Sequence, residues 1–151
     1  MKSLIYTAVL SVMFSFTVQV NAQNSDDIVG NWLNQEGTAK IYIFKADNGK
    51  FKGKYYGKII WLSEPLKNGK PKLDDQNPDV AKRTKEINGL IILNNFTFDA
   101  DDKIWNGGTI YDPKNGKTYS CEITKKGEKL NVRGYVGISM MGRTAIWTKT
   151  N

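Results

Sequence analysis

The sequence predicts an all-β protein: an antiparallel up-and-down barrel of about eight strands, with one short helix between two of them. Three observations support this fold class. Apolar and polar residues alternate with a period of two along most of the chain, turn sequences separate the alternating segments, and one long segment carries inward glycines that indicate a strongly coiled strand. A β-sandwich built from the same strands is the alternative.

The N-terminus differs from the rest of the chain. Lys2 precedes an apolar run over residues 4–20, and small residues follow up to Ala22, a pattern typical of a secretory signal peptide cleaved after Ala22. An N-terminal membrane anchor is the alternative, at the short limit for spanning a bilayer. Residues 23–151 then form a single domain, and we expect a periplasmic or secreted protein that does not span a membrane.

The composition excludes several kinds of chemistry. The chain has no histidine, which removes the commonest general base and the commonest zinc ligand. Its single cysteine, Cys121, excludes an intrachain disulfide and lies too far from the cleavage site to carry a lipid. We expect no metal and no cofactor. The net charge of +7, in an exported protein, favours an anionic envelope polymer or a lipid surface over nucleic acid as a partner; the alternative is that the charge only keeps the protein soluble.

The strands follow one another with turns between them. Gly30-Asn31-Trp32 opens the first strand, and a long strand over residues 50–62 has lysines on its outer face. Its inner face carries Phe51, Gly53, Tyr55, Gly57, Ile59 and Trp61. The other strands are expected over residues 39–45, 90–98, 103–111, 117–124, 129–136 and 143–150. The lysine face either binds an anionic polymer or is simply solvated.

Two further features belong to the later strands. Cys121 alternates with Tyr119 and Ile123 on an apolar face, which predicts a buried structural thiol. Ile138, Met140 and Met141 fall in a turn before the last strand. We expect these apolar side chains to plug one end of the barrel; alternatively they face a partner or a membrane.

The first and last strands carry a pattern that resembles the closure of lipocalin-like barrels. Gly30 and Trp32 open the first strand, while Arg143 and Trp147 lie on the last. In that arrangement a guanidinium lies across an indole ring and seals one end of the barrel through a cation–π contact.

Several segments in order are similar to one family. They are "NPD" with an arginine four residues after the aspartate, "GLIIL", "WNGGTIYDPKNGKTY", "LNVRGYVG" and "GRTAIWTK". Together they resemble the domain of unknown function 2147 family of small exported bacterial proteins. The resemblance implies a lipocalin-like barrel and a location in the bacterial envelope, and it implies no established substrate.

The segment over residues 73–93 has two interpretations. Its carboxylates match the spacing of a calcium loop, but Val80 stands where such loops need glycine, and Lys82 and Arg83 would oppose the metal. The preferred interpretation is a short helix with Asn77 as N-cap and Pro78 at the first helical position, which residues 80–85 complete. Asp79 and Arg83 are then spaced for an ion pair.

Three functions are compatible with these observations. The preferred one is a non-enzymatic barrel that binds a small apolar or amphipathic molecule. Candidate ligand-binding residues are Tyr55, Ile59, Trp61, Trp105 and Tyr111 inside the barrel, with Asp79 and Arg83 at its entrance; the alternative for the aromatic residues is a filled core. The second function is an envelope interaction or structural protein that uses its basic surface around a filled core. The third is a carboxylate-based enzyme, for which the sequence assigns no catalytic residue.

Overall fold

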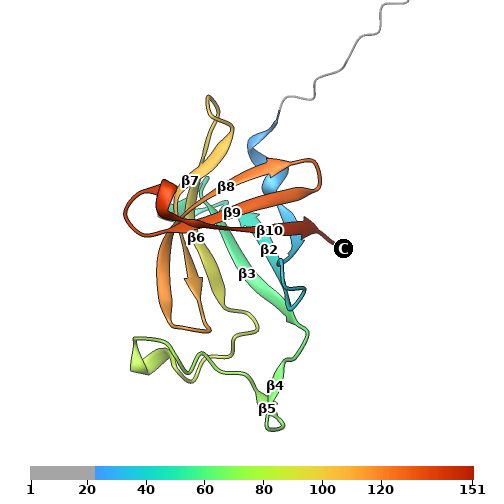
Figure 1. Cartoon of the computed structure of the whole chain (residues 1–151), viewed down its shortest axis with the longest axis vertical. Coiled ribbons are helices and arrows are strands. Elements are labelled where there is room, and N and C mark those ends of the chain that lie inside the picture. Colours follow the sequence, from blue (N-terminus) through green and yellow to red (C-terminus); the bar gives the residue numbers. More distant parts are fainter. Residues whose placement is uncertain (1–22) are drawn as a thin grey trace, which may run out of the picture.

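The computed structural model describes residues 23–151 (Figure 1). The predicted signal peptide, residues 1–22, lies outside these residues, so export stays a prediction. The described chain forms a closed antiparallel barrel of eight strands in the order β1-β10-β9-β8-β7-β6-β3-β2. The strands are β1 (Gly30–Leu33), β2 (Ala39–Lys45), β3 (Tyr55–Leu62), β6 (Ile91–Asp99), β7 (Ile104–Asp112), β8 (Lys117–Lys126), β9 (Lys129–Tyr135) and β10 (Arg143–Lys149). The predicted fold class is confirmed, and the sandwich alternative is wrong.

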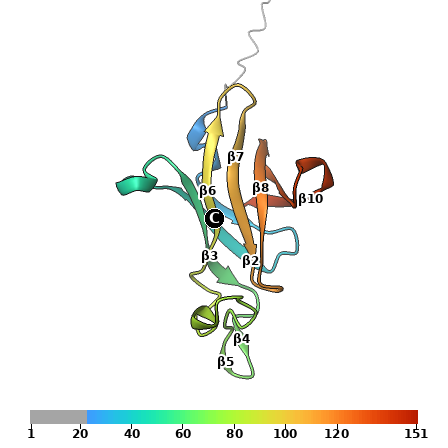
Figure 2. The same cartoon turned by 90° about the vertical axis from the view of Figure 1, so that its left-hand side faces the viewer.

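The barrel closes where the last strand meets the first. Trp32 pairs with Lys149, and Leu33 pairs with Thr148. The 3₁₀ helix η1 (Ser25–Ile28) precedes β1, and three more lie between strands: η2 (Gly49–Phe51), η3 (Val80–Lys82) and η4 (Ser139–Met141). A long excursion over residues 63–90 separates β3 from β6 and holds η3 and the hairpin of β4 (Leu66–Lys67) and β5 (Lys70–Pro71). Figures 1 and 2 show this excursion beyond one end of the barrel.

The predicted long strand over residues 50–62 is shorter than expected. β3 begins at Tyr55, because Gly49 and Gly53 have φ values of 65° and 84°, which interrupt an extended strand. Phe51 therefore lies in η2 and is 45% exposed rather than inward-facing.

Trp61, predicted to line the interior, lies on the outer face of β3. Lys40 pairs with Trp61 while Ile41 pairs with Ile59, so a β-bulge places one extra residue in β3. Because side chains alternate between faces, this extra residue turns Trp61 outward. Trp61 is 42% exposed, and the centroid of its ring lies 5.8 Å from the Lys40 ammonium nitrogen.

One end of the barrel is covered by η1, and we call it the closed end. Ile28 of η1 is fully buried, and its carbonyl oxygen accepts a hydrogen bond from Trp32 Nε1 at 2.8 Å. Trp105 Nε1 donates to the Ser25 carbonyl at 2.9 Å. Each indole N–H is thus satisfied by the backbone of η1, which fixes the helix across the barrel end.

Asp26 of η1 adds a polar contact to the closed end. Its carboxylate accepts hydrogen bonds from Lys45 Nζ at 2.8 Å and from the Tyr55 hydroxyl at 2.6 Å. These two donors hold the pKa of Asp26 below its usual value, Lys45 being the larger cause. Tyr55 and Trp105, both predicted ligand-binding residues, therefore belong to the structure of the closed end.

Arg143 does not make the predicted contact across Trp32. Within residues 23–151, cations lie over the rings of Trp61, Tyr55 and Phe51, and each of these cations is a lysine. Trp32 pairs with Lys149, at the far end of β10 from Arg143. The six positions between Arg143 and Lys149 correspond to about 20 Å along the strand, too far for the guanidinium to lie across the Trp32 ring. The sequence resemblance predicted an arginine seal, and η1 makes the seal instead.

Cys121 is fully buried, as predicted, and its thiol has an elevated pKa. Burial, which disfavours the thiolate, raises the pKa of Cys121 to about 12. The thiol is therefore protonated and shielded, which confirms the structural role predicted from its position on an apolar strand face.

The turn between β9 and β10 does not plug the barrel. Ile138, Met140 and Met141 are 63%, 86% and 78% exposed, and Val136 is 74% exposed. Figure 2 shows this loop projecting from the side of the barrel beside β10. The predicted plug is wrong, because this loop projects away from the barrel and its apolar side chains are left in solvent.

Candidate functional site

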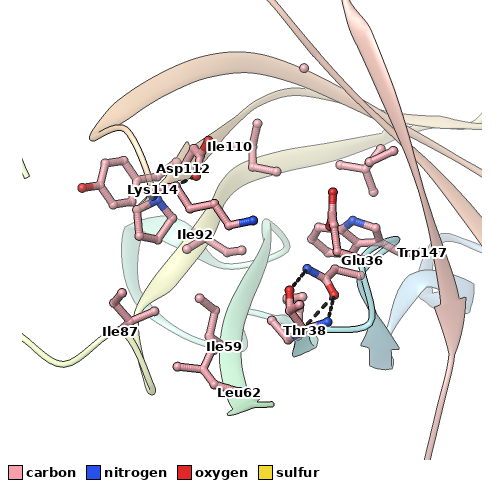
Figure 3. Close-up of a pocket in the computed structure, with 18 of the residues that line it drawn as sticks. Glu36, Thr38, Ile59, Leu62, Ile87, Ile92, Ile110, Asp112, Lys114 and Trp147 are labelled. Carbon is pink, nitrogen blue, oxygen red and sulfur yellow. Dashed lines mark hydrogen bonds between the residues drawn. The ribbon is translucent and has the colours of Figure 1, made fainter. Parts of the chain in front are cut away.

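The end opposite η1 opens into a cavity of about 720 Å³. We call this end the mouth. Strands on all sides of the barrel contribute inward apolar side chains, among them Ile41, Ile59, Ile92, Ile110, Val132 and Trp147. Figure 3 shows Ile59, Ile92, Ile110 and Trp147 around this space. The interior is thus only partly filled, in contrast to the filled core of the second sequence-based hypothesis.

Polar side chains form the rim of the mouth. They come from the turn over residues 34–38, from the excursion, from the turn over residues 112–116 and from the start of β10. Asn34 stabilises the first turn by accepting hydrogen bonds at Oδ1 from the backbone of Thr38 and Ala39, at 2.8 and 3.0 Å. Charged side chains at the rim are Glu36, Glu64, Lys72, Asp112, Lys114 and Arg143.

The excursion is anchored to the barrel through a buried carboxylate. Asp74 is fully buried and accepts hydrogen bonds from the Tyr111 hydroxyl and from Asn77 Nδ2, both at 2.6 Å. Desolvation and the hydrogen bond to Asp74 raise the pKa of Tyr111 to about 12. Tyr111 therefore lines the cavity with its ring while its hydroxyl is committed to the excursion.

A second contact holds the excursion against the turn between β7 and β8. Gly116 packs so closely on the excursion that a Cβ atom there would lie 1.9 Å from the carbonyl oxygen of Gln76. Only glycine permits this approach, which explains the glycine at the end of the turn. The excursion is thus part of the mouth.

The helix in the excursion differs from the predicted one. It is the 3₁₀ helix η3, and its N-cap is Asp79, whose carboxylate accepts from the backbone N–H of Ala81 at 3.1 Å. In a 3₁₀ helix residues three apart are aligned, so Asp79 pairs with Lys82 at 3.1 Å rather than with Arg83. Lys82 and the Ala81 N–H lower the pKa of Asp79.

Asn77 and Arg83 also have roles other than those predicted. Asn77 Oδ1 accepts from the backbone N–H of Asp79 at 2.9 Å, as in an Asx turn, instead of capping the helix. Arg83 Nε donates to the carbonyl oxygen of Asn77 at 2.7 Å. These contacts fold the excursion on itself.

The structure brings two of the predicted ligand-binding residues to the cavity. Ile59 and Tyr111 line it, whereas Asp79 and Arg83 are exposed on the excursion, away from the cavity lining. The sequence interpretation missed the contribution of the last strand. Arg143, Ala145 and Trp147 share one face of β10 and all line the cavity, and their alternation was the available signal.

Two further observations concern metal binding and membrane-spanning helices. Residues 23–151 contain no group of three or more Asp, Glu, Cys or His side chains placed to hold a metal ion. No helix in this part of the chain combines the length and apolar character needed to cross a membrane.

Comparisons with known proteins agree with this architecture. A profile of the family described as "Uncharacterized protein conserved in bacteria (DUF2147)" matches residues 30–149. A similar solved structure is described as "Protein HP1028 from the human pathogen Helicobacter pylori belongs to the lipocalin family". The likeness has a TM-score of 0.69 at 22% identity and covers 83% of this chain and 84% of that chain, so it shows a shared fold. No curated protein matches the sequence.

Proposed function

Because this chain belongs to the DUF2147 family of bacterial proteins and folds as a lipocalin-like barrel, we propose that it binds a small apolar or amphipathic molecule inside the barrel without catalysing a reaction. The observation that carries the proposal is the open, apolar cavity. Its volume of about 720 Å³ falls within the range of about 300–1,000 Å³ typical of pockets for small molecules.

The titratable groups also favour binding over catalysis. A carboxylic acid that donates a proton near neutral pH needs a raised pKa. Three carboxyl groups within residues 23–151 have a lowered pKa: Lys45 is the main cause at Asp26, Gln76 at Asp75 and Lys82 at Asp79. The groups with a raised pKa include Tyr111 and Cys121, which stay protonated at neutral pH.

Filling the cavity tests the proposed function. Ala145 lines the cavity, so Ala145→Phe places a ring where the ligand would lie. We expect this change to weaken binding of the neutral dye N-phenylnaphthylamine at least about tenfold, because overlap with the ring excludes the dye from the barrel. Dye fluorescence measures the affinity, and thermal unfolding checks that the variant is folded.

The matched control is the neighbouring residue on the outer face. Ile146 is 44% exposed, so Ile146→Phe adds a ring of the same kind outside the barrel. Dye binding should then equal that of the unaltered protein. If the unaltered protein binds no apolar dye or lipid-like compound, or if both variants bind it equally well, the proposed function is wrong.

A second candidate function is docking to an anionic membrane surface through the β9–β10 loop. The loop segment over residues 136–142 carries four exposed apolar side chains and no charged residue. Arg133 holds this segment in place by donating to the Met140 carbonyl at 3.3 Å and to Thr144 Oγ1 at 2.8 Å. Insertion of such side chains into a bilayer, with basic residues beside them, is typical of interfacial binding.

Vesicle binding tests this second function. We expect Met140→Ser combined with Met141→Ser to weaken binding to vesicles of phosphatidylglycerol by about tenfold or more, since two exposed apolar side chains leave the bilayer. Co-sedimentation measures the bound fraction. Val80 is 69% exposed on η3, so Val80→Ser provides a control that should bind unchanged. Absence of vesicle binding by the unaltered protein would exclude this function.

A further inference from the structure

Arg143 occupies an inward position at the mouth of the barrel. It pairs with Gly134 of β9, shares a strand face with Ala145 and Trp147, and lines the cavity. Inward positions of small barrels are normally filled by apolar side chains. Arg143 begins its strand and is exposed to solvent at the mouth, so its guanidinium is hydrated there and accessible to a ligand that enters the cavity.

Within the described part of the chain, residues 23–151, the Arg143 guanidinium forms no ion pair with a carboxylate. The ion pairs formed among residues 23–151 use Lys45, Lys67, Lys72, Lys82 and Lys149. Of the acidic residues at the rim, Glu64 pairs with Lys72 at 3.3 Å, and Asp112 Oδ1 accepts from the backbone N–H of Lys114 at 2.9 Å. An arginine carries five N–H donors in a fixed fork that matches a carboxylate or a phosphate.

The partner strand leaves room beside this guanidinium. Gly134 lies directly opposite Arg143 on β9 and also lines the cavity. A Cβ atom at Gly134 would lie 3.4 Å from Ile110 Cγ2 and 3.7 Å from Tyr119 Cβ, which are ordinary contacts. The fold therefore admits a side chain here, and its absence leaves space for a ligand to approach the backbone.

Lys114 supplies a second cation at the mouth. It lies on the turn between β7 and β8, lines the cavity and is absent from the ion pairs among residues 23–151. Figure 3 shows Lys114 and Glu36 at opposite sides of the cavity. The net positive charge of the chain, +7 with Lys2 of the predicted signal peptide contributing one unit, adds a long-range attraction for anions.

We infer that the ligand is an amphipathic anion with one apolar chain, whose carboxylate or phosphate head is bound by Arg143 with Lys114 while its chain lies against Ile41 and Trp147. This inference rests on the proposed function and adds the chemical class of the ligand. Hydrogen bonds between charged groups give the head its specificity, and burial of the chain gives affinity.

Binding of three compounds with the same chain tests the inference: dodecanoate, dodecyl phosphate and dodecan-1-ol, each displacing N-phenylnaphthylamine. We expect the unaltered protein to bind at least one of the two anions about ten- to a hundred-fold more tightly than the alcohol. Arg143→Gln should remove this preference and leave the affinity for the alcohol unchanged. A larger loss of affinity for dodecanoate in Arg143→Gln identifies the head group as a carboxylate, and a larger loss for dodecyl phosphate identifies it as a phosphate.

Glu36→Gln is the matched control, because it changes a charge of opposite sign at the same rim. We expect it to bind the anions as tightly as the unaltered protein or more tightly. Equal affinity of the unaltered protein for the alcohol and both anions, or an equal loss for all three compounds in Arg143→Gln, would overturn the inference and leave the proposed function intact. Failure to bind any of the three would count against the proposed function itself.

Discussion

Replacing Trp32 by alanine is expected to lower the free energy of unfolding by about 3–5 kcal/mol. The indole is fully buried at the closed end, and its Nε1 donates to the Ile28 carbonyl at 2.8 Å. The change leaves a large cavity beneath η1 and an unpaired carbonyl in a buried setting, and these costs add. Urea unfolding followed by circular dichroism measures the loss.

Two other variants make this result interpretable. Trp61→Ala removes an indole that is 42% exposed on the outer face, so it should cost less than about 1 kcal/mol. Trp32→Phe keeps most of the packing and removes only the hydrogen bond. We expect this variant to fold, so it can be measured even if Trp32→Ala is unfolded. Equal stability of Trp32→Ala and Trp61→Ala would mean that η1 does not seal the barrel.

The second large effect is expected at the base of the excursion. Asp74→Ala should destabilise the protein by about 2–4 kcal/mol, because it leaves the Tyr111 hydroxyl and the Asn77 amide without their shared acceptor. We also expect faster amide hydrogen exchange over residues 63–90, since this contact anchors the excursion to β7. Denaturant unfolding and hydrogen exchange by mass spectrometry measure the two effects.

The adjacent aspartate provides the control. Asp75 pairs with Lys67 at 3.3 Å at an exposed position, so Asp75→Ala should change stability by no more than about 0.5 kcal/mol. A stability of Asp74→Ala equal to or above that of the unaltered protein would show that the desolvation of the buried carboxylate outweighs its hydrogen bonds. The anchoring role of Asp74 would then be wrong.

Local sequence patterns were sufficient for most of the strands. The predicted strand over residues 39–45 coincides with β2, and the one over residues 103–111 differs from β7 by a single residue at each end. Period-two alternation and turn residues act over a few neighbours, so they are readable without tertiary information. The burial of Cys121 followed from the same alternation.

The candidate site was only partly predictable. Ile59 and Tyr111 line the cavity as expected, but Trp61 points outward because a bulge in β3 changes its face. The sequence did not indicate that Asp74 is buried and Asp75 exposed, because the burial of Asp74 depends on its contact with Tyr111, 37 residues away. Contacts of this separation are set when the barrel closes.

The sequence by itself determined the fold class, the order of the strands and the apolar character of the interior, since alternation and turns are local properties of the chain. Tertiary structure decided which end of the barrel is closed and therefore where a ligand can enter. Packing of η1 on Trp32 and Trp105 closes one end, which leaves Arg143 at the open one rather than in the seal. That outcome depends on contacts between segments far apart in the chain, which no local pattern specifies.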